Sequence, residues 1–138
     1  MIPEIGHLLL IGALVLTFIG GSLPFYDLVL KKSFSQNYIR PLSILISLLV
    51  LGSFTCLIYS FLVDDFSVVY VASNSNTALP NYYKFAAAWG AHEGSLVLWI
   101  LCLSLWLLGY LFSKDSVNDH FSSITFAVMN QVIFAFIL

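Results

Sequence analysis

Charged residues are scarce in this sequence, and their scarcity excludes an ordinary soluble domain. Only 9% of the 138 residues are Asp, Glu, Lys or Arg, whereas a typical soluble domain carries roughly 25%. Apolar residues make up 60% of the chain, and the mean hydropathy is +0.98. The five Lys and Arg are scattered and form no basic stripe that could neutralise phosphates, which argues against nucleic acid as a partner.

Cysteine motifs and common catalytic motifs are also missing. Cys56 and Cys102 lie in long apolar runs and belong to neither a CxxC nor a CxxCH sequence, so no thiol–disulfide or covalent haem attachment motif is present. We interpret both as small apolar residues. No Ser/His/Asp arrangement or Gly-rich phosphate loop occurs. Met1 to Glu4 carry no Lys or Arg, so we expect the first apolar segment to be retained rather than cleaved as a secretory signal.

Long apolar runs are what the sequence does contain. A bilayer core about 30 Å thick requires about 20 apolar helical residues. Runs of about this length cover residues 8–30, 41–63, 95–112 and 121–138, and the first is interrupted by Gly20, Gly21 and Pro24. The sequence therefore predicts an all-α, polytopic transmembrane helix bundle with about four spans in one membrane domain, 1–138. Because the last run ends without a polar tail, we expect the N-terminal part of a larger protein or a split gene product.

The distribution of positive charge predicts the orientation of these spans. Lys31, Lys32 and Arg40 lie between the first two runs and Lys114 between the last two, whereas only Lys84 lies in the other connection. Cytoplasmic loops carry the excess of Lys and Arg. This bias predicts that the N-terminus and the 64–94 connection face outward.

The 64–94 connection divides into two parts. Residues 66–71 are prone to β structure and lead into a polar tract, which predicts a loop or short extended segment. After Pro80, Tyr82, Phe85 and Trp89 recur at helical spacing. This spacing predicts a short helix over 81–89 that lies at the membrane interface.

A polar cluster precedes the third span and provides the candidate site. The cluster comprises Trp89, Gly90, Ala91, His92, Glu93, Gly94 and Ser95. One interpretation is structural: Trp89 in an aromatic belt, glycines at a turn, Ser95 as N-cap and Glu93 favoured by the helix dipole. The alternative is that His92 and Glu93 act on a molecule at the outer leaflet, as a metal ligand, proton carrier or hydrogen-bonding partner. Adjacent helical residues do not face each other, so a joint metal site would need a non-helical backbone.

Other polar residues are assigned structural roles. Glu4 and His7 share a helix face and are interpreted as an interfacial pair. Asp27 is expected to meet Lys31, four residues later. His120, next to Asp119, is expected to be solvated in a cytoplasmic loop.

Trp99, Cys102 and Trp106 follow one face of the third span at spacings of three and four residues. We expect this to be a packing face between helices.

Several separated motifs follow one another along the chain: Met1-Ile2-Pro3-Glu4-Ile5-Gly6-His7, 66–72 with Ser75-Asn76 and Leu79-Pro80, Tyr83-Lys84, and 89–99. Together, and in this order, they resemble the N-terminal region of the CcmF family of cytochrome c-type biogenesis haem lyases. The family is expected to have glycine where this chain has Ala91, a change that the turn tolerates only without a positive φ.

The resemblance implies a membrane haem lyase component that promotes covalent attachment of haem to the CxxCH motif of apocytochrome c. Haem is then the implied cofactor, and the implied partners are apocytochrome c, a haem chaperone, other maturation proteins, the bilayer, and the rest of the polypeptide or a partner chain. The implied location is the cell inner membrane, or the mitochondrial inner membrane if the source is organellar.

The family's Trp-rich WWD segment and haem-ligating histidines have no match in these residues, so we transfer no haem ligand or catalytic residue, and whether the chain is itself an enzyme stays open. The resemblance implies at most that the cluster Trp89, Gly90, His92, Glu93, Gly94 and Ser95 shapes the surface where haem and apocytochrome meet. The alternative function is a non-catalytic membrane scaffold or interaction subunit. A transporter is disfavoured because the spans offer few polar groups at membrane depth.

Overall fold

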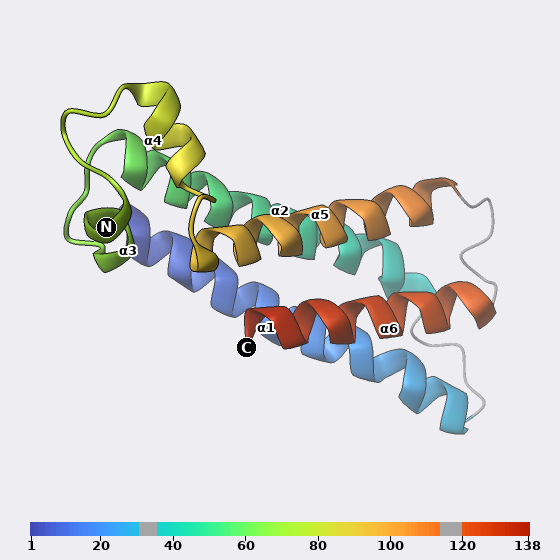
Figure 1. The fold of residues 1–138 in the computed structure, drawn as a ribbon. Helices are drawn as coiled ribbons and strands as arrows, with labels where there is room; N and C mark the ends of the chain where they lie inside the picture. The colour runs from blue at the N-terminus through green and yellow to red at the C-terminus, as the bar shows by residue number, and fades with distance from the viewer. Residues whose placement is uncertain (31–35, 114–119) are drawn as a thin grey trace.

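The structure, a computed structural model, is an all-helical bundle over the residues it describes, which are 1–30, 36–113 and 120–138. The long helices are α1 (Ile2–Leu30), α2 (Gln36–Leu62), α5 (His92–Ser113) and α6 (His120–Ile137). Two short helices, α3 (Val69–Asn74) and α4 (Asn81–Ala87), lie between α2 and α5. Figure 1 shows the N-terminus, α3 and α4 gathered at one end of the bundle, which we call the loop end. The fold class predicted from sequence is confirmed.

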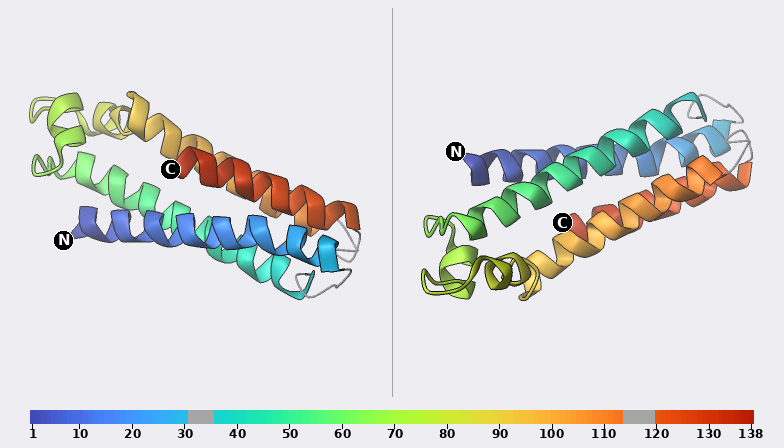
Figure 2. Two further views of the ribbon diagram at one scale, coloured as in Figure 1. Left: turned by 90° about the horizontal axis from the view of Figure 1, so that it is seen from below. Right: turned by 90° about the horizontal axis from the view of Figure 1, so that it is seen from above.

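Packing in the bundle is not uniform around each helix. α1 and α5 each pack on both α2 and α6 (Figure 2). The main core cluster lies where these four helices meet, and consists of Ala13, Ile46, Val50, Phe54, Ile100, Leu101 and Ile133. A second cluster, away from the loop end, consists of Ile39, Leu107, Leu111 and Phe126. A third, made by Phe61, Val71 and Ala88, joins α2 to the loop-end segments.

Three helices are long and apolar enough to cross a membrane, within the described residues: Ile2–Asp27, Asn37–Leu62 and His92–Ser113. The fourth predicted span is present as α6, a shorter apolar helix of 18 residues. Gly20, Gly21 and Pro24, which interrupt the apolar run in the sequence, lie within the continuous helix α1. Large apolar side chains such as Leu8, Val29 and Leu48 remain exposed on the bundle surface, as expected of helices whose solvent is lipid.

Most buried hydroxyl groups in the long helices are satisfied locally. The Ser43 hydroxyl donates to the carbonyl of Ile39, and the Ser60 hydroxyl to that of Cys56. Ser47 instead donates across the bundle to the carbonyl of Ser104, at 3.2 Å, and so links α2 to α5. Hydroxyl groups that bond to their own helix can be buried in an apolar environment without a separate partner.

The two predictions for the 64–94 connection have different outcomes. The helix expected over 81–89 is confirmed as α4, although its place at a membrane interface stays a prediction. The loop or short extended segment expected from residue 66 is confirmed as a loop at 66–68 and is wrong beyond it, because Val69–Asn74 forms α3. β-prone residues follow their packing environment, and here Val71 is buried with Phe61 and Ala88.

The structure places the N-terminus and the 64–94 connection at the same end (Figure 1). Which end of the bundle faces the cytoplasm stays a prediction. The expected Asp27–Lys31 pair involves Lys31, which lies outside the described residues. The loop position expected for His120 is wrong, because His120 is the first residue of α6.

Candidate functional site

The first turn of α5 contains the candidate His92 and Glu93, and it has regular helical geometry. α5 begins at His92, and Glu93 is the acidic residue of its first turn, where the helix dipole favours a carboxylate. Consecutive helical residues point in different directions, so His92 and Glu93 do not converge on one ligand. The arrangement required for a joint His92/Glu93 metal site is therefore absent.

Ser95 does not cap α5, contrary to the sequence-based expectation. Its backbone N–H donates to the carbonyl of Ala91, and its hydroxyl donates to the carbonyl of His92 at 2.8 Å. The helix had already begun at His92, so Ser95 lies within it rather than before it.

The connection from α4 to α5 is tightly packed around Gly94. The Gly94 N–H donates to the Tyr70 hydroxyl at 3.1 Å, and that hydroxyl in turn donates to the carbonyl of Ala88 at 3.4 Å. A Cβ atom at position 94 would overlap the Ala88 carbonyl oxygen and crowd the Tyr70 hydroxyl. Because Gly94 has no side chain, the backbone there can lie close to the Ala88 carbonyl and the Tyr70 hydroxyl. Gly90 lies in the turn itself. Ala91 has no positive φ, so alanine fits there as the sequence argument requires.

Trp89 packs against neighbouring helices, and its place in an aromatic belt stays a prediction. Its ring meets Phe85 of α4 edge-on, with centroids 4.9 Å apart, and lies 6.3 Å from the ring of Phe54 on α2. The half-buried indole thus ties the turn before α5 to the bundle.

A buried ion pair at the loop end was not predicted from the sequence. The Lys84 ammonium on α4 contacts the Asp64 carboxylate just after α2, at 2.5 Å, and the two side chains are only 6% and 21% exposed. Asp64 has a positive φ of 55°, a conformation that Asp adopts more readily than most residues. The two residues are 20 positions apart in sequence, and their contact joins the end of α2 to α4.

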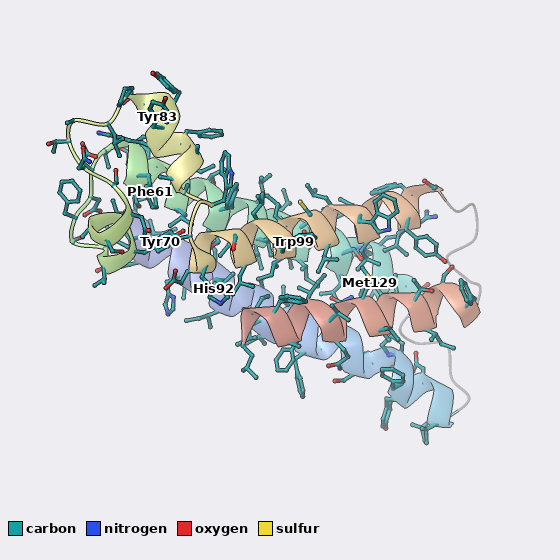
Figure 3. All side chains as sticks on the ribbon, in the orientation of Figure 1. Phe61, Tyr70, Tyr83, His92, Trp99 and Met129 are labelled. Atoms are coloured by element: carbon teal, nitrogen blue, oxygen red, sulfur yellow. The ribbon has the colours of Figure 1, made fainter. Side chains whose placement is uncertain are left out.

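A small pocket at the loop end brings together residues that the sequence analysis treated separately. It has a volume of about 210 Å³ and lies between α1, α2, α5 and the α3 segment. His7 of α1 and Glu93 of α5 lie on its wall with Tyr70, and the rest is largely apolar: Pro3, Gly6, Leu10, Ser53, Cys56, Leu57, Ser60, Val68, Gly94 and Val97. Figure 3 shows Tyr70 and Phe61 beside the start of α5, where His92 lies.

His92 is not among the residues that line this pocket, and Glu4 pairs with the N-terminal amine at 3.5 Å rather than with His7. Of the site residues predicted from sequence, the pocket therefore gathers Glu93 and Gly94, with His7 as an addition. The pocket forms because α1 packs against α2. No local sequence motif encodes that contact, so the sequence carries no signal for the pocket.

The described residues do not form a haem or metal site. No group of three or more His, Cys, Asp or Glu side chains lies close enough to hold a metal ion among the residues the structure describes. The pocket that His7 lines is smaller than the roughly 300–1,000 Å³ usual for cofactor sites. A larger open groove on α5 is lined without histidine. The residues present thus do not fit haem on their own.

No protein-family model matches the chain. Individual known proteins, however, match it over its whole length. The chain is 43% identical over 138 residues to the cytochrome c-type biogenesis protein CcmF of Pseudomonas aeruginosa, covering 100% of this chain and 21% of that protein. It is 38% identical over 136 residues to the cytochrome c-type biogenesis protein NrfE of Haemophilus influenzae, covering 99% of this chain and 21% of that protein.

A solved structure described as "Cytochrome c Heme Lyase CcmF" matches with a TM-score of 0.90 and 28% identity, over 99% of this chain and 23% of that one. The chain spans about a fifth of the length of the curated relatives it matches. These matches confirm the resemblance found in the sequence motifs. The chain is therefore homologous, over its whole length, to the N-terminal part of the CcmF family of cytochrome c-type biogenesis proteins.

Proposed function

We propose that this chain forms the N-terminal membrane framework of a CcmF-type haem lyase, which promotes covalent attachment of haem to the CxxCH motif of apocytochrome c. The observation that carries the proposal is the whole-length match, in sequence and in fold, to proteins described as cytochrome c biogenesis proteins and as a haem lyase. Haem, apocytochrome c and a haem chaperone are then the molecules that the complete system handles.

Within that system, this chain supports the reaction rather than holding the cofactor. The described residues include no cluster of metal-ligating side chains, and the pocket beside His7 is small. What the chain supplies is a rigid loop end, in which Tyr70, Gly94 and the Lys84–Asp64 pair fix the backbone before α5. We place this end on the outer face of an inner membrane, because the Lys and Arg bias puts the other end in the cytoplasm.

The functional test replaces His92 and Glu93 with alanine, separately and together, in the complete polypeptide or complex that contains this chain. Glu93 lies on the pocket wall and His92 does not, so we expect Glu93→Ala to lower the yield of holocytochrome c more than His92→Ala. The measurement is haem-dependent peroxidase staining of cytochrome c, normalised to the variant's level in membranes.

Glu4→Ala is the matched control, since Glu4 is an exposed carboxylate at the same end that pairs with the terminal amine. It should leave the yield unchanged. Full holocytochrome c yield in the double variant, at equal protein level, would show that the loop end takes no part in the reaction.

The second candidate is a scaffold without any direct part in haem chemistry, and the absence of a fitting haem site among the described residues favours it. The yield measurement separates the two. A lower holocytochrome c yield in Glu93→Ala at equal protein level supports direct participation of the loop end, whereas full yield in the double variant supports the scaffold.

A further inference from the structure

One face of α5 is left uncovered by the rest of the chain. Trp99 is 63% exposed and Trp106 is 76% exposed, and Cys102 between them is also exposed. The packing face that the sequence predicted at these residues is thus not used within the described bundle. The side of α5 that packs on α2 and α6 carries other residues: Ile100, Leu101, Ser104, Leu107 and Leu111.

Both exposed indoles lie within α5 rather than at its ends. α5 has 22 residues, or about 33 Å of helix at 1.5 Å per residue. Trp99 comes seven residues after His92, and Trp106 seven residues before Ser113, so each is roughly 10 Å from its end of the helix. Tryptophan that contacts lipid is enriched at the membrane interfaces, where its N–H reaches water or headgroups. Trp99 and Trp106 lie about two helical turns inside the ends of α5 instead.

No described residue accepts a hydrogen bond from either indole in the structure. A polar N–H in hydrocarbon without a partner is costly. Two such groups on one helix face therefore indicate a surface that protein covers, rather than one that lipid covers.

The shape of this face also fits a helix. An open groove of about 660 Å³ runs along it, lined by Cys102, Leu105, Trp106, Gly109, Tyr110 and Ser113. A Cβ atom at Gly109 would meet nothing within 4 Å. Membrane helices approach closely over such small residues, and Trp106 beside Gly109 would form one wall of the contact.

We propose that this Trp99–Trp106 face binds a further membrane-spanning helix from the part of a CcmF-type sequence that this chain does not match. This chain covers 21% of the curated relative and 23% of the solved neighbour, so about four-fifths of such a protein lies outside the matched region and can supply the helix. The helix carries a hydrogen-bond acceptor, a Ser or Thr hydroxyl, an Asn or Gln amide or a freed backbone carbonyl, level with the two indoles. The proposal rests on homology and packing, and does not require that haem attachment be the function.

The test places a photoreactive benzophenone side chain at position 106, by Trp106→p-benzoylphenylalanine, in the complete polypeptide or complex in native membranes. Leu48 of α2 is the matched control, because it is 59% exposed and also lies near the middle of its helix. After irradiation, mass spectrometry should identify adducts of position 106 with an apolar peptide from CcmF-type sequence outside this chain. The same group at position 48 should give lipid adducts.

Lipid adducts at both positions would overturn the proposal. Adducts of position 106 with the α5 peptide of a second copy, or with haem, would overturn it as well, in favour of self-association or a cofactor face.

A second variant tests the groove directly. A Cβ atom at position 109 meets nothing within 4 Å, so Gly109→Leu extends into the open groove and the bundle should still fold. With the benzophenone at position 99 instead, adduct yield should fall by about tenfold when position 109 is leucine, because the larger side chain blocks the close approach. Undiminished yield at equal protein level would contradict a helix in the groove.

Discussion

Gly94 and the Tyr70 hydroxyl share a very small space at the start of α5. At the scale of single residues, this is the tightest backbone approach in the candidate site, because any Cβ at position 94 overlaps the Ala88 carbonyl. The hydroxyl bonds both sides of the turn, at Ala88 and at Gly94. The glycine therefore allows the phenol to hold the turn in place.

Gly94→Ala should destabilise the loop end, by roughly 1–3 kcal/mol if it behaves as an overpacked site. The backbone of residues 88–94 must move to accept the methyl group, which also breaks the bond to Tyr70. Hydrogen exchange of the amides in α4 and the first turn of α5 measures the effect.

Gly109→Ala is the control on the same helix, since position 109 is open. It should be neutral, or stabilising by about 0.5–1 kcal/mol from helix propensity. Equal protection in the two variants would mean that the 88–94 turn is not held by close packing.

Tyr70→Phe tests the other half of this contact. The variant keeps the ring, which packs edge-on against Phe61 with centroids 5.4 Å apart, and removes only the hydroxyl. The loss should be about 1 kcal/mol, the usual net value of a hydrogen bond, and should appear as faster exchange of the Gly94 amide. Exchange at Gly94 that matches the parent protein would show that water replaces the phenol without cost.

At the residue scale, the sequence singled out the candidate cluster but not the contacts that hold it in place. The cluster of His92, Glu93 and Gly94 is visible as a local departure from apolar composition. Tyr70 lies 24 residues from Gly94, and nothing near it marks it as a partner. Contacts between distant segments depend on how the helices pack, which local pattern does not encode.

At the scale of elements, the loop-end helices are joined to the bundle by the Lys84–Asp64 pair. In the sequence, Lys84 is a lone positive charge in a long connection and part of the Tyr83-Lys84 motif, and neither feature predicts that it is buried. In the structure it is buried on α4 and neutralised by a carboxylate that follows α2. α3 was not predicted for a related reason. Its residues are β-prone, and their helical conformation depends on the packing of Val71 against Phe61 and Ala88.

Lys84→Met should loosen α4, because it leaves the Asp64 carboxylate largely buried without its cation. Hydrogen bonds to charged groups contribute about 1.5–3 kcal/mol, and we expect a loss of that order in the stability of the loop end. Limited proteolysis in the 75–80 segment of detergent-solubilised protein reports the change.

The double variant Lys84→Met/Asp64→Asn removes the stranded charge, and asparagine tolerates the positive φ at position 64. It should regain part of the protease resistance lost by Lys84→Met alone. A double variant cleaved faster than the single one would contradict the view that an uncompensated charge causes the loss.

At the scale of the whole molecule, the apolar runs predicted the bundle well and its boundaries less well. α1 begins at Ile2 rather than at 8, and α5 at His92 rather than at 95. Polar residues such as Glu4 and Glu93 are stable in a first helical turn, where the helix dipole favours them. An apolar run alone therefore underestimates the length of a helix at its N-terminal end.

The predicted orientation can be tested with single cysteines in a Cys56→Ala/Cys102→Ala background. Thr77→Cys lies in the exposed loop between α3 and α4, and Asn37→Cys lies exposed at the opposite end, near the start of α2. In spheroplasts, a membrane-impermeant maleimide should label position 77 directly and position 37 only after permeabilisation. The reverse pattern would invert the topology and place the loop end in the cytoplasm.

The bond between Tyr70 and Gly94 also has a consequence for how CcmF-type sequences diverge. The phenol is useful only where position 94 lacks a side chain, and position 94 must lack one only while the 88–94 turn stays this tight. The two positions are therefore expected to be inherited as a pair. A lineage that replaces the glycine should also have lost the tyrosine, or have lengthened the turn between them.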